Sequence, residues 1–155
     1  MKSGVPSVRH FYRPVLKIMH WTALALIVLI LLNGLNGWVR WGLILVAVLW
    51  GLGYAVFGHL SRPGPALTGL ARSGFKAMHV IVLAALEMAA VAALLAPNGL
   101  LDGATRVIFL LTLGLGLLHG IFHLWRHTAL GDGALRNITP RQMHGITPRL
   151  MHGIL

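Results

Sequence analysis

The stretch PVLKIMHWTALALIVLILLN, residues 14–33, decides the fold of this chain. A helix needs about 20 mainly apolar residues to cross the hydrocarbon core of a bilayer, and this stretch has that length with Lys17 as its only charged side chain. A cleaved secretory signal has a shorter apolar core and a small-residue cleavage pattern after it, which this segment lacks. We therefore expect residues 14–33 to form a retained membrane-spanning helix.

Three further apolar stretches follow at residues 39–57, 75–96 and 107–125. Turn-forming sequences rich in Asn, Gly and Pro separate them. No stretch alternates apolar and polar residues as a barrel strand would, and helices satisfy their own backbone hydrogen bonds in lipid. The sequence therefore predicts an all-α integral membrane protein, a four-helix up-down-up-down transmembrane bundle.

Composition supports this class, because 57% of the residues are hydrophobic, only 10% are charged and the mean hydropathy is +0.79. The absence of cysteine excludes covalent haem attachment through a C-x-x-C-H motif, thiolate-bound iron–sulfur clusters and disulfides. The net charge of +10 does not indicate nucleic-acid binding, since the cations flank apolar runs and form no stripe on a polar domain.

The positions of Lys and Arg predict the orientation. Most of them precede the first stretch, lie between the second and third, or follow the fourth, and only Arg40 and Arg106 fall on the other side. By the positive-inside rule, both termini are cytoplasmic. We expect a cytoplasmic segment at 1–13, a transmembrane domain at 14–127 and a cytoplasmic tail at 128–155.

Histidines mark both ends of this domain. His20 lies early in the first apolar stretch, and His119, His123 and His127 recur every four residues along the last, on one helix face. Ionisable residues within spans are costly and usually functional, and neutral imidazole is a standard axial ligand of haem iron. At 1.5 Å per residue, His20 lies about 9 Å inside its span, His119 about 12 Å and His123 about 6 Å.

These depths predict that His20 and His119 bind one haem iron, with His123 as a reserve ligand or a residue near the porphyrin edge. Gly116 and Gly120 flank His119 and permit close approach of a helix or of a flat macrocycle. We rank an interfacial position first for His10, His59 and His127. For His79 we also rank an interfacial, hydrogen-bonding role above that of a ligand.

Several segments of the chain resemble the bacterial cytochrome b561 family, which is related to the b-type subunits of nickel–iron hydrogenases and formate dehydrogenases. The resemblance rests on YRPVLKIMHW at 12–21, Asn33-Gly34-Leu35, LTGLA at 67–71, Leu118-His119 and DGALR at 132–136, and it covers most of residues 9–140. It implies a four-helix cytochrome of the bacterial inner membrane that exchanges electrons with quinone and usually carries two haems. By motif position, His20 and His119 match the family's ligands to the haem near the cytoplasmic face.

The family's ligands to the outer haem have no counterpart here. The start of the second stretch reads WVRWG at 38–42 and the region before the fourth reads DGATR at 102–106, where the family has histidines. We therefore expect one haem b, held by two histidines near the cytoplasmic face. The outer position would be filled by protein or closed by Trp38 and Trp41.

Two other features of the sequence concern charge. Haem propionates attract bases, and Arg126 lies seven residues after His119 on nearly the same helix face. The alternatives to Arg126 are Arg13, Lys17, Arg72 and Lys76, and each of these cations could instead bind lipid headgroups. Glu87 lies near the middle of the third stretch, where it would accept a proton or bond a neighbouring helix.

The tail repeats ITPRQMHG (138–145) as ITPRLMHG (146–153), and the prolines predict an extended arm that docks a partner or anionic lipid. Together these observations predict an electron-transfer subunit and not a stand-alone enzyme. It would take part in quinone-linked electron transfer with other membrane subunits of a redox complex. The alternative is a haem-free structural subunit that stabilises such a complex; a transporter ranks third, because no span is broken at mid-membrane.

Overall fold

A computed structural model describes residues 8–58, 63–96, 101–131 and 133, with side chains from residue 14 onward in these ranges. The tail repeat, His10, His59 and Arg13 lie outside the described side chains. The described chain forms four helices: α1 (Val8–Asn33), α2 (Gly37–Phe57), α3 (Gly69–Leu95) and α4 (Gly103–Ala129). All four are long and apolar enough to cross a membrane, so the predicted all-α membrane fold is confirmed.

The helices are longer than the apolar stretches that predicted them. α1 begins six residues before Pro14, and α3 and α4 each have 27 residues, or about 40 Å at 1.5 Å per residue. In α1, α3 and α4 the added residues include the polar and charged residues that flank the apolar stretch. Apolar periodicity could not place these ends, because a helix continues past the hydrocarbon core into the headgroup layer.

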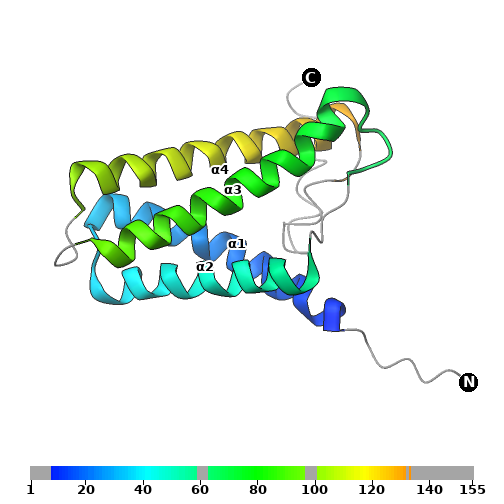
Figure 1. Ribbon diagram of the computed structural model, residues 1–155. Helices are drawn as coiled ribbons and strands as arrows, with labels where there is room; N and C mark the ends of the chain where they lie inside the picture. The colour runs from blue at the N-terminus through cyan, green and yellow to red at the C-terminus, as the bar shows by residue number, and fades with distance from the viewer. Residues whose placement is uncertain (1–7, 59–62, 97–100, 132, 134–155) are drawn as a thin grey trace, which may run out of the picture.

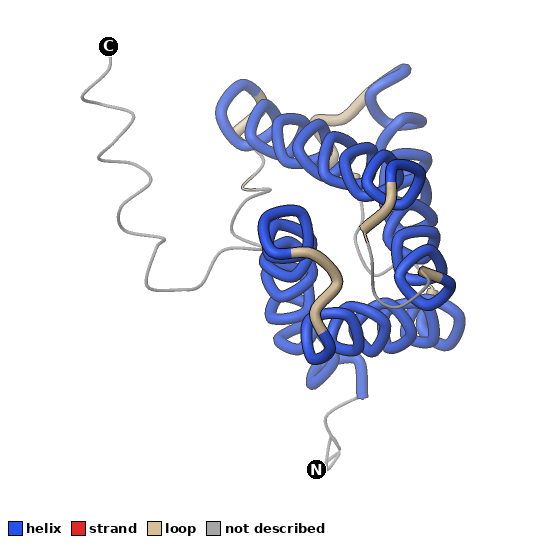
Figure 2. Tube along the Cα trace, turned by 90° about the vertical axis from the view of Figure 1, so that its left-hand side faces the viewer, coloured by secondary structure: helices blue, strands red, loops and turns tan. Residues whose placement is uncertain are grey.

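The four helices surround a common axis, as Figure 2 shows end-on. In Figure 1, α1 and α3 run in one direction and α2 and α4 in the other. Each helix packs on the next one along the chain and α4 packs back on α1, although α1 and α4 are the least closely packed of these neighbours. The end of the bundle where α1 begins and α4 ends is called the inner end below, and the opposite end the outer end.

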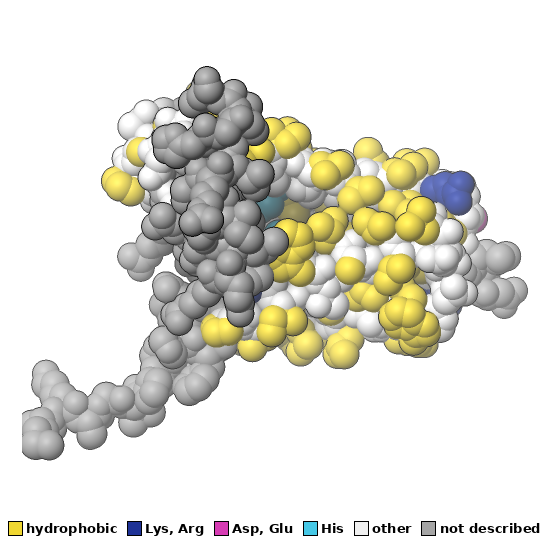
Figure 3. Space-filling model, turned by 180° about the vertical axis from the view of Figure 1, so that it is seen from behind, with side chains coloured by type: hydrophobic (Ala, Val, Ile, Leu, Met, Phe, Trp, Pro, Cys, Tyr) yellow, Lys and Arg dark blue, Asp and Glu magenta, His cyan; other side chains and the backbone are white. Residues whose placement is uncertain are grey.

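Apolar side chains fill the outer end of the bundle. Ile30 of α1, Leu43 of α2 and Phe109 of α4 are fully buried there, and Ala93 of α3 packs with them in one cluster. The lipid-facing surface is also apolar: large hydrophobic side chains are exposed along all four helices, and Figure 3 shows them over one face. An exposed apolar surface of this extent fits contact with lipid and not with water.

Three polar contacts tie the helices to one another or close their ends. The Arg40 guanidinium donates to the Leu94 carbonyl of α3, at 2.8 Å. The Thr112 hydroxyl of α4 lies 3.1 Å from the Ala85 carbonyl of α3. At the start of α4, the Asp102 carboxylate accepts a 2.7 Å hydrogen bond from the Thr105 backbone N–H and thereby caps the helix.

Candidate functional site

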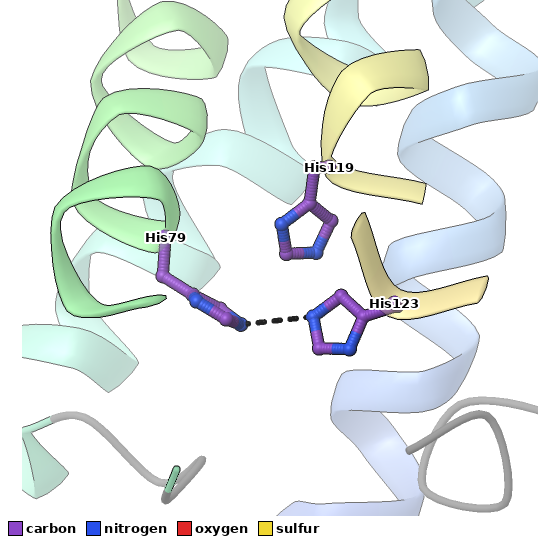
Figure 4. A group of neighbouring side chains, drawn as sticks. All are labelled: His79, His119 and His123. Atoms are coloured by element: carbon purple, nitrogen blue, oxygen red, sulfur yellow. Dashed lines mark hydrogen bonds between the residues drawn. The ribbon is translucent and has the colours of Figure 1, made fainter. Parts of the chain in front are cut away.

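Four histidine side chains from three helices gather between the middle and the inner end of the bundle. His20 comes from α1, His79 from α3, and His119 and His123 from successive turns of α4. His119 lies about 24 Å along α4 from Gly103 and about 15 Å from Ala129, at 1.5 Å per residue. Figure 4 shows His79, His119 and His123 pointing toward one another.

The structure brings His20 and His119 together across the α1–α4 contact, as the depth argument requires. Their ring centroids are 6.3 Å apart and the rings are inclined at 51°. His20 is half-buried, and its ring lies near the rings of Trp21 and Trp50, at centroid distances of 5.9 and 6.0 Å. His119 is only 7% exposed, and its Nδ1 has no hydrogen-bond partner among the described residues.

The separation of these two rings fits two ligands on opposite sides of one metal ion. A metal lies about 2 Å from an imidazole nitrogen, which is itself about 1.2 Å from the ring centre, so two opposed ligands have centroids about 6.4 Å apart. The observed 6.3 Å agrees with this value.

His79 joins the cluster from α3. The two ring centroids are 4.6 Å apart, and the rings are almost perpendicular. The Nδ1 atom of His79 lies 2.7 Å from the Phe75 carbonyl oxygen one turn earlier in α3. Because a carbonyl oxygen only accepts, Nδ1 carries the proton, and the lone pair of His79 is on Nε2.

That Nε2 atom faces His123. The two Nε2 atoms are 3.3 Å apart, and the dashed line in Figure 4 marks this contact. His123 is 6% exposed and its ring centroid lies 4.5 Å from that of His119. Each of the three residues His79, His119 and His123 offers a ligand atom, and these atoms all lie within 4.8 Å of one another, close enough to hold a metal ion.

Arg126 is the buried cation beside this cluster. It is 4% exposed, and its guanidinium lies 4.8 Å from the centre of the Phe75 ring, in a cation–π arrangement. Phe75 in turn packs on the His79 ring, with centroids 4.3 Å apart. Of the other cations considered for this role, Lys17 is half-buried, and Arg72 and Lys76 are exposed.

Glu87 lies apart from the histidines, against α2. A Cβ atom built on Gly51 would be 2.7 Å from Glu87 Oε1, so the carboxyl group occupies the space that the glycine leaves. Oε1 is buried and has no hydrogen-bond partner among the described residues. Sequence reasoning placed Glu87 at mid-span, but it did not identify Gly51 as the residue that makes room for it.

The structure departs from the expectation for Trp38 and Trp41. Trp38 and Trp41 do not close the outer end, because they are 72% and 59% exposed on the outside of α2. A helix turns about 100° per residue, so Val39 and Leu43 take the inward positions instead. At Gly116 and Gly120 an added Cβ would meet nothing within 4 Å among the described residues, so no described helix approaches closely there. The other alternative for these glycines, close approach of a flat macrocycle, stays a prediction.

His79 is the residue whose place the sequence underestimated. We ranked a hydrogen-bonding interfacial role first, and its Nδ1 does hydrogen-bond the Phe75 carbonyl of its own helix; its ring also lies inside the cluster, with its centroid 4.6 Å from that of His119. The signal that could have found it is its spacing: His79 lies one turn after Phe75 on the same helix face, and a large aromatic side chain favours the face that packs inward. The structure buries the Phe75 ring fully. His127, by contrast, is half-buried beyond the cluster, two turns after His119.

No family model, no curated protein and no solved structure matches this chain. The function is therefore argued from the site itself. Its four imidazoles provide two overlapping ligand sets: the pair His20 and His119, whose ring centroids are 6.3 Å apart, and the group of three formed by His79, His119 and His123.

Proposed function

We propose that this chain is a b-type cytochrome of the bacterial inner membrane, with one haem held by His20 and His119. It takes part in quinone-linked electron transfer as a subunit of a larger redox complex. The observation that carries the proposal is the 6.3 Å separation of the two rings, which come from the first and last helices and match opposed ligands on one iron.

Bound haem supplies a one-electron couple between ferric and ferrous iron. The residues of the chain set the conditions for that couple. His20 and His119 would hold the haem iron, and burial of His119 would keep water from its side of the site. Arg126, held over the Phe75 ring, provides a positive charge for a haem propionate, the role predicted from its position after His119.

The apolar outer end supports a single haem. Ile30, Leu43 and Phe109 are fully buried there, and the described helices place no histidine among them. Electrons therefore enter and leave through the region of the histidine cluster. The positive-inside rule places that region toward the cytoplasm, near any donor or acceptor subunit bound at that face.

A visible spectrum of the detergent-purified chain, supplied with haem b, tests the proposal. We expect a Soret band and a sharp alpha band on reduction, with a stoichiometry of one haem per chain. His20→Ala and His119→Ala should each abolish the reduced alpha band. His127→Ala is the matched control, because His127 lies on the same helix as His119 but outside the cluster, and this variant should keep the spectrum.

Rapid mixing with a reduced quinol tests the quinone link. The ferric protein should be reduced by the quinol in the absence of any other donor. A folded chain that binds no haem under these conditions would overturn the proposal and favour the haem-free structural subunit. A haem spectrum that survives both His20→Ala and His119→Ala would overturn the assignment of the ligands.

A further inference from the structure

The three imidazoles of His79, His119 and His123 form a ligand set that the haem proposal does not use as a unit. We propose that, when His119 is not bound to haem, these three residues bind one divalent first-row transition metal ion of the Zn²⁺ class. Haem and the metal ion then exclude one another, because both need His119. The metal site stands on its own geometry, and only the competition rests on the proposed function.

The distances in the cluster fit such an ion. Imidazole nitrogens lie about 2.0–2.1 Å from zinc, so two of them in a tetrahedral site are about 3.3–3.4 Å apart. The Nε2 atoms of His79 and His123 are 3.3 Å apart, and all three ligand atoms lie within 4.8 Å of one another. Little movement is therefore needed to bring the three nitrogens around one ion.

The spacing along the chain is also suitable. His119 and His123 are four residues apart, which puts both side chains on one face of α4, the same spacing by which helical histidine pairs bind zinc in proteins. The third ligand, His79, comes from the neighbouring helix α3. Ligands from two packed helices fix the site through the fold and not through a loop.

Hydrogen bonding prepares His79 as a ligand. Metal-binding histidines commonly donate their other ring N–H to a carbonyl, which fixes the tautomer and the ring orientation. His79 does this through Nδ1, 2.7 Å from the Phe75 carbonyl oxygen, so its lone pair is on Nε2, the atom that faces His123. In the metal-free state the His123 Nε2–H donates to this lone pair, and a shift of that proton to Nδ1 frees His123 for the metal.

The ligand chemistry selects the class of ion. Three neutral imidazoles, with no carboxylate or thiolate in the cluster, favour zinc, copper, nickel or cobalt over magnesium and calcium. Three protein ligands leave a fourth position open, as in zinc sites that bind water or another small ligand. The buried Nδ1 atom of His119 has no hydrogen-bond partner among the described residues.

The experiment uses Co²⁺ and Zn²⁺ with the haem-free, detergent-purified full chain. Co²⁺ should give the visible absorption of a tetrahedral site at one ion per chain, and Zn²⁺ should displace it. Added Zn²⁺ should also slow or prevent haem uptake, in proportion to its occupancy. Mg²⁺ is the matched control and should neither displace Co²⁺ nor affect haem uptake.

Four variants separate the two ligand sets. His79→Ala and His123→Ala should each weaken Co²⁺ binding at least about 100-fold, because each removes a ligand and loss of a residue that only supports a ligand already costs up to about 100-fold. His79→Ala should also keep the haem spectrum. His20→Ala should lose haem and keep Co²⁺, and His119→Ala should lose both. Helical circular dichroism of each variant verifies that the chain remains folded.

The outcomes that overturn the inference differ from those that overturn the haem proposal. Co²⁺ binding that is unchanged in folded His79→Ala, or no binding to the folded wild-type chain at millimolar Co²⁺, would exclude the three-histidine site. A chain that binds Co²⁺ through these residues but takes up no haem would retain the metal site and refute the cytochrome. Simultaneous binding of haem and Zn²⁺ at full occupancy would refute the competition.

Discussion

The carboxyl group of Glu87 in α3 occupies the space above Gly51 in α2, where an added Cβ would lie 2.7 Å from Oε1. A membrane-embedded carboxyl group is costly unless it is neutral or packed against protein, and the glycine allows α2 to cover it. The pair therefore sets how closely α2 and α3 pack at this level.

A larger residue at position 51 should lower the stability of the bundle. Gly51→Ala should have a small effect, because the flexible end of Glu87 can move away and alanine favours the helix. Gly51→Leu should cost about 1–3 kcal/mol, since it forces the two helices apart. Thermal unfolding in detergent measures the difference. Gly114→Leu is the control, because an added Cβ there meets nothing within 4 Å among the described residues.

Loss of the Arg40 side chain should loosen the outer end of α3. Its guanidinium donates to the Leu94 carbonyl, one of the last carbonyls of the helix, which lack partners within it. Hydrogen bonds that involve a charged group contribute about 1.5–3 kcal/mol, so Arg40→Met should lower stability by up to this amount. Hydrogen exchange should show the loss at the end of α3. Equal protection in both proteins would contradict the prediction.

The cap at the start of α4 should make stability depend on pH. Hydrogen bonds from the backbone and the side chain of Thr105 hold the pKa of Asp102 below its usual range. Because the folded-state pKa is lowered, the stabilisation is complete above the unfolded-state pKa and is lost as the pH falls through the folded-state pKa. The thermal midpoint of Asp102→Ala should therefore lie below that of the wild type at neutral pH. The two midpoints should converge in acid, and a gap independent of pH would exclude this cause.

Replacement of Arg126 should affect the two proposed ligands in opposite directions. A nearby positive charge favours ferrous over ferric iron and opposes a divalent ion. Arg126→Gln should lower the haem midpoint potential, because it removes one positive charge from beside the site. It should also tighten Co²⁺ binding by the three histidines. Arg126→Lys keeps the charge and should change the midpoint potential and the Co²⁺ affinity less. If Arg126→Gln lowered both the midpoint potential and the Co²⁺ affinity, or raised both, the electrostatic argument would be wrong.

Hydrophobic pattern alone was enough to predict four membrane helices, because bilayer thickness fixes the length that each apolar stretch must have. Counting residues from the end of each span was enough to predict that His20 and His119 lie at similar depths, since the rise per residue is constant along a helix, and their ring centroids are 6.3 Å apart. The direction in which each helix face points was harder to predict. Trp38 and Trp41 face outward and His79 faces inward, and both facts depend on how α2 and α3 are rotated against their neighbours.

Length and depth are properties of one helix, whereas rotation is decided by packing between helices. In a membrane, lipid and protein interior are similarly apolar, so hydrophobicity does not distinguish the two faces of a helix as it does in water. Small residues allow two helices to pack closely, but they do not specify where close packing occurs. Gly51 marks a close contact between α2 and α3, while Gly116 and Gly120 face open space, and the sequence does not separate these two cases.

The position of the histidines along the bundle has an electrical consequence. A full crossing of the membrane by one elementary charge changes its energy by about 2.3 kcal/mol per 100 mV. Charges that reach the cluster from the nearer end of α4 cross the smaller part of that field. A membrane voltage should therefore have only a weak effect on electrons or ions that reach the histidines from this nearer end. It should have a stronger effect on charges that reach them from the opposite face.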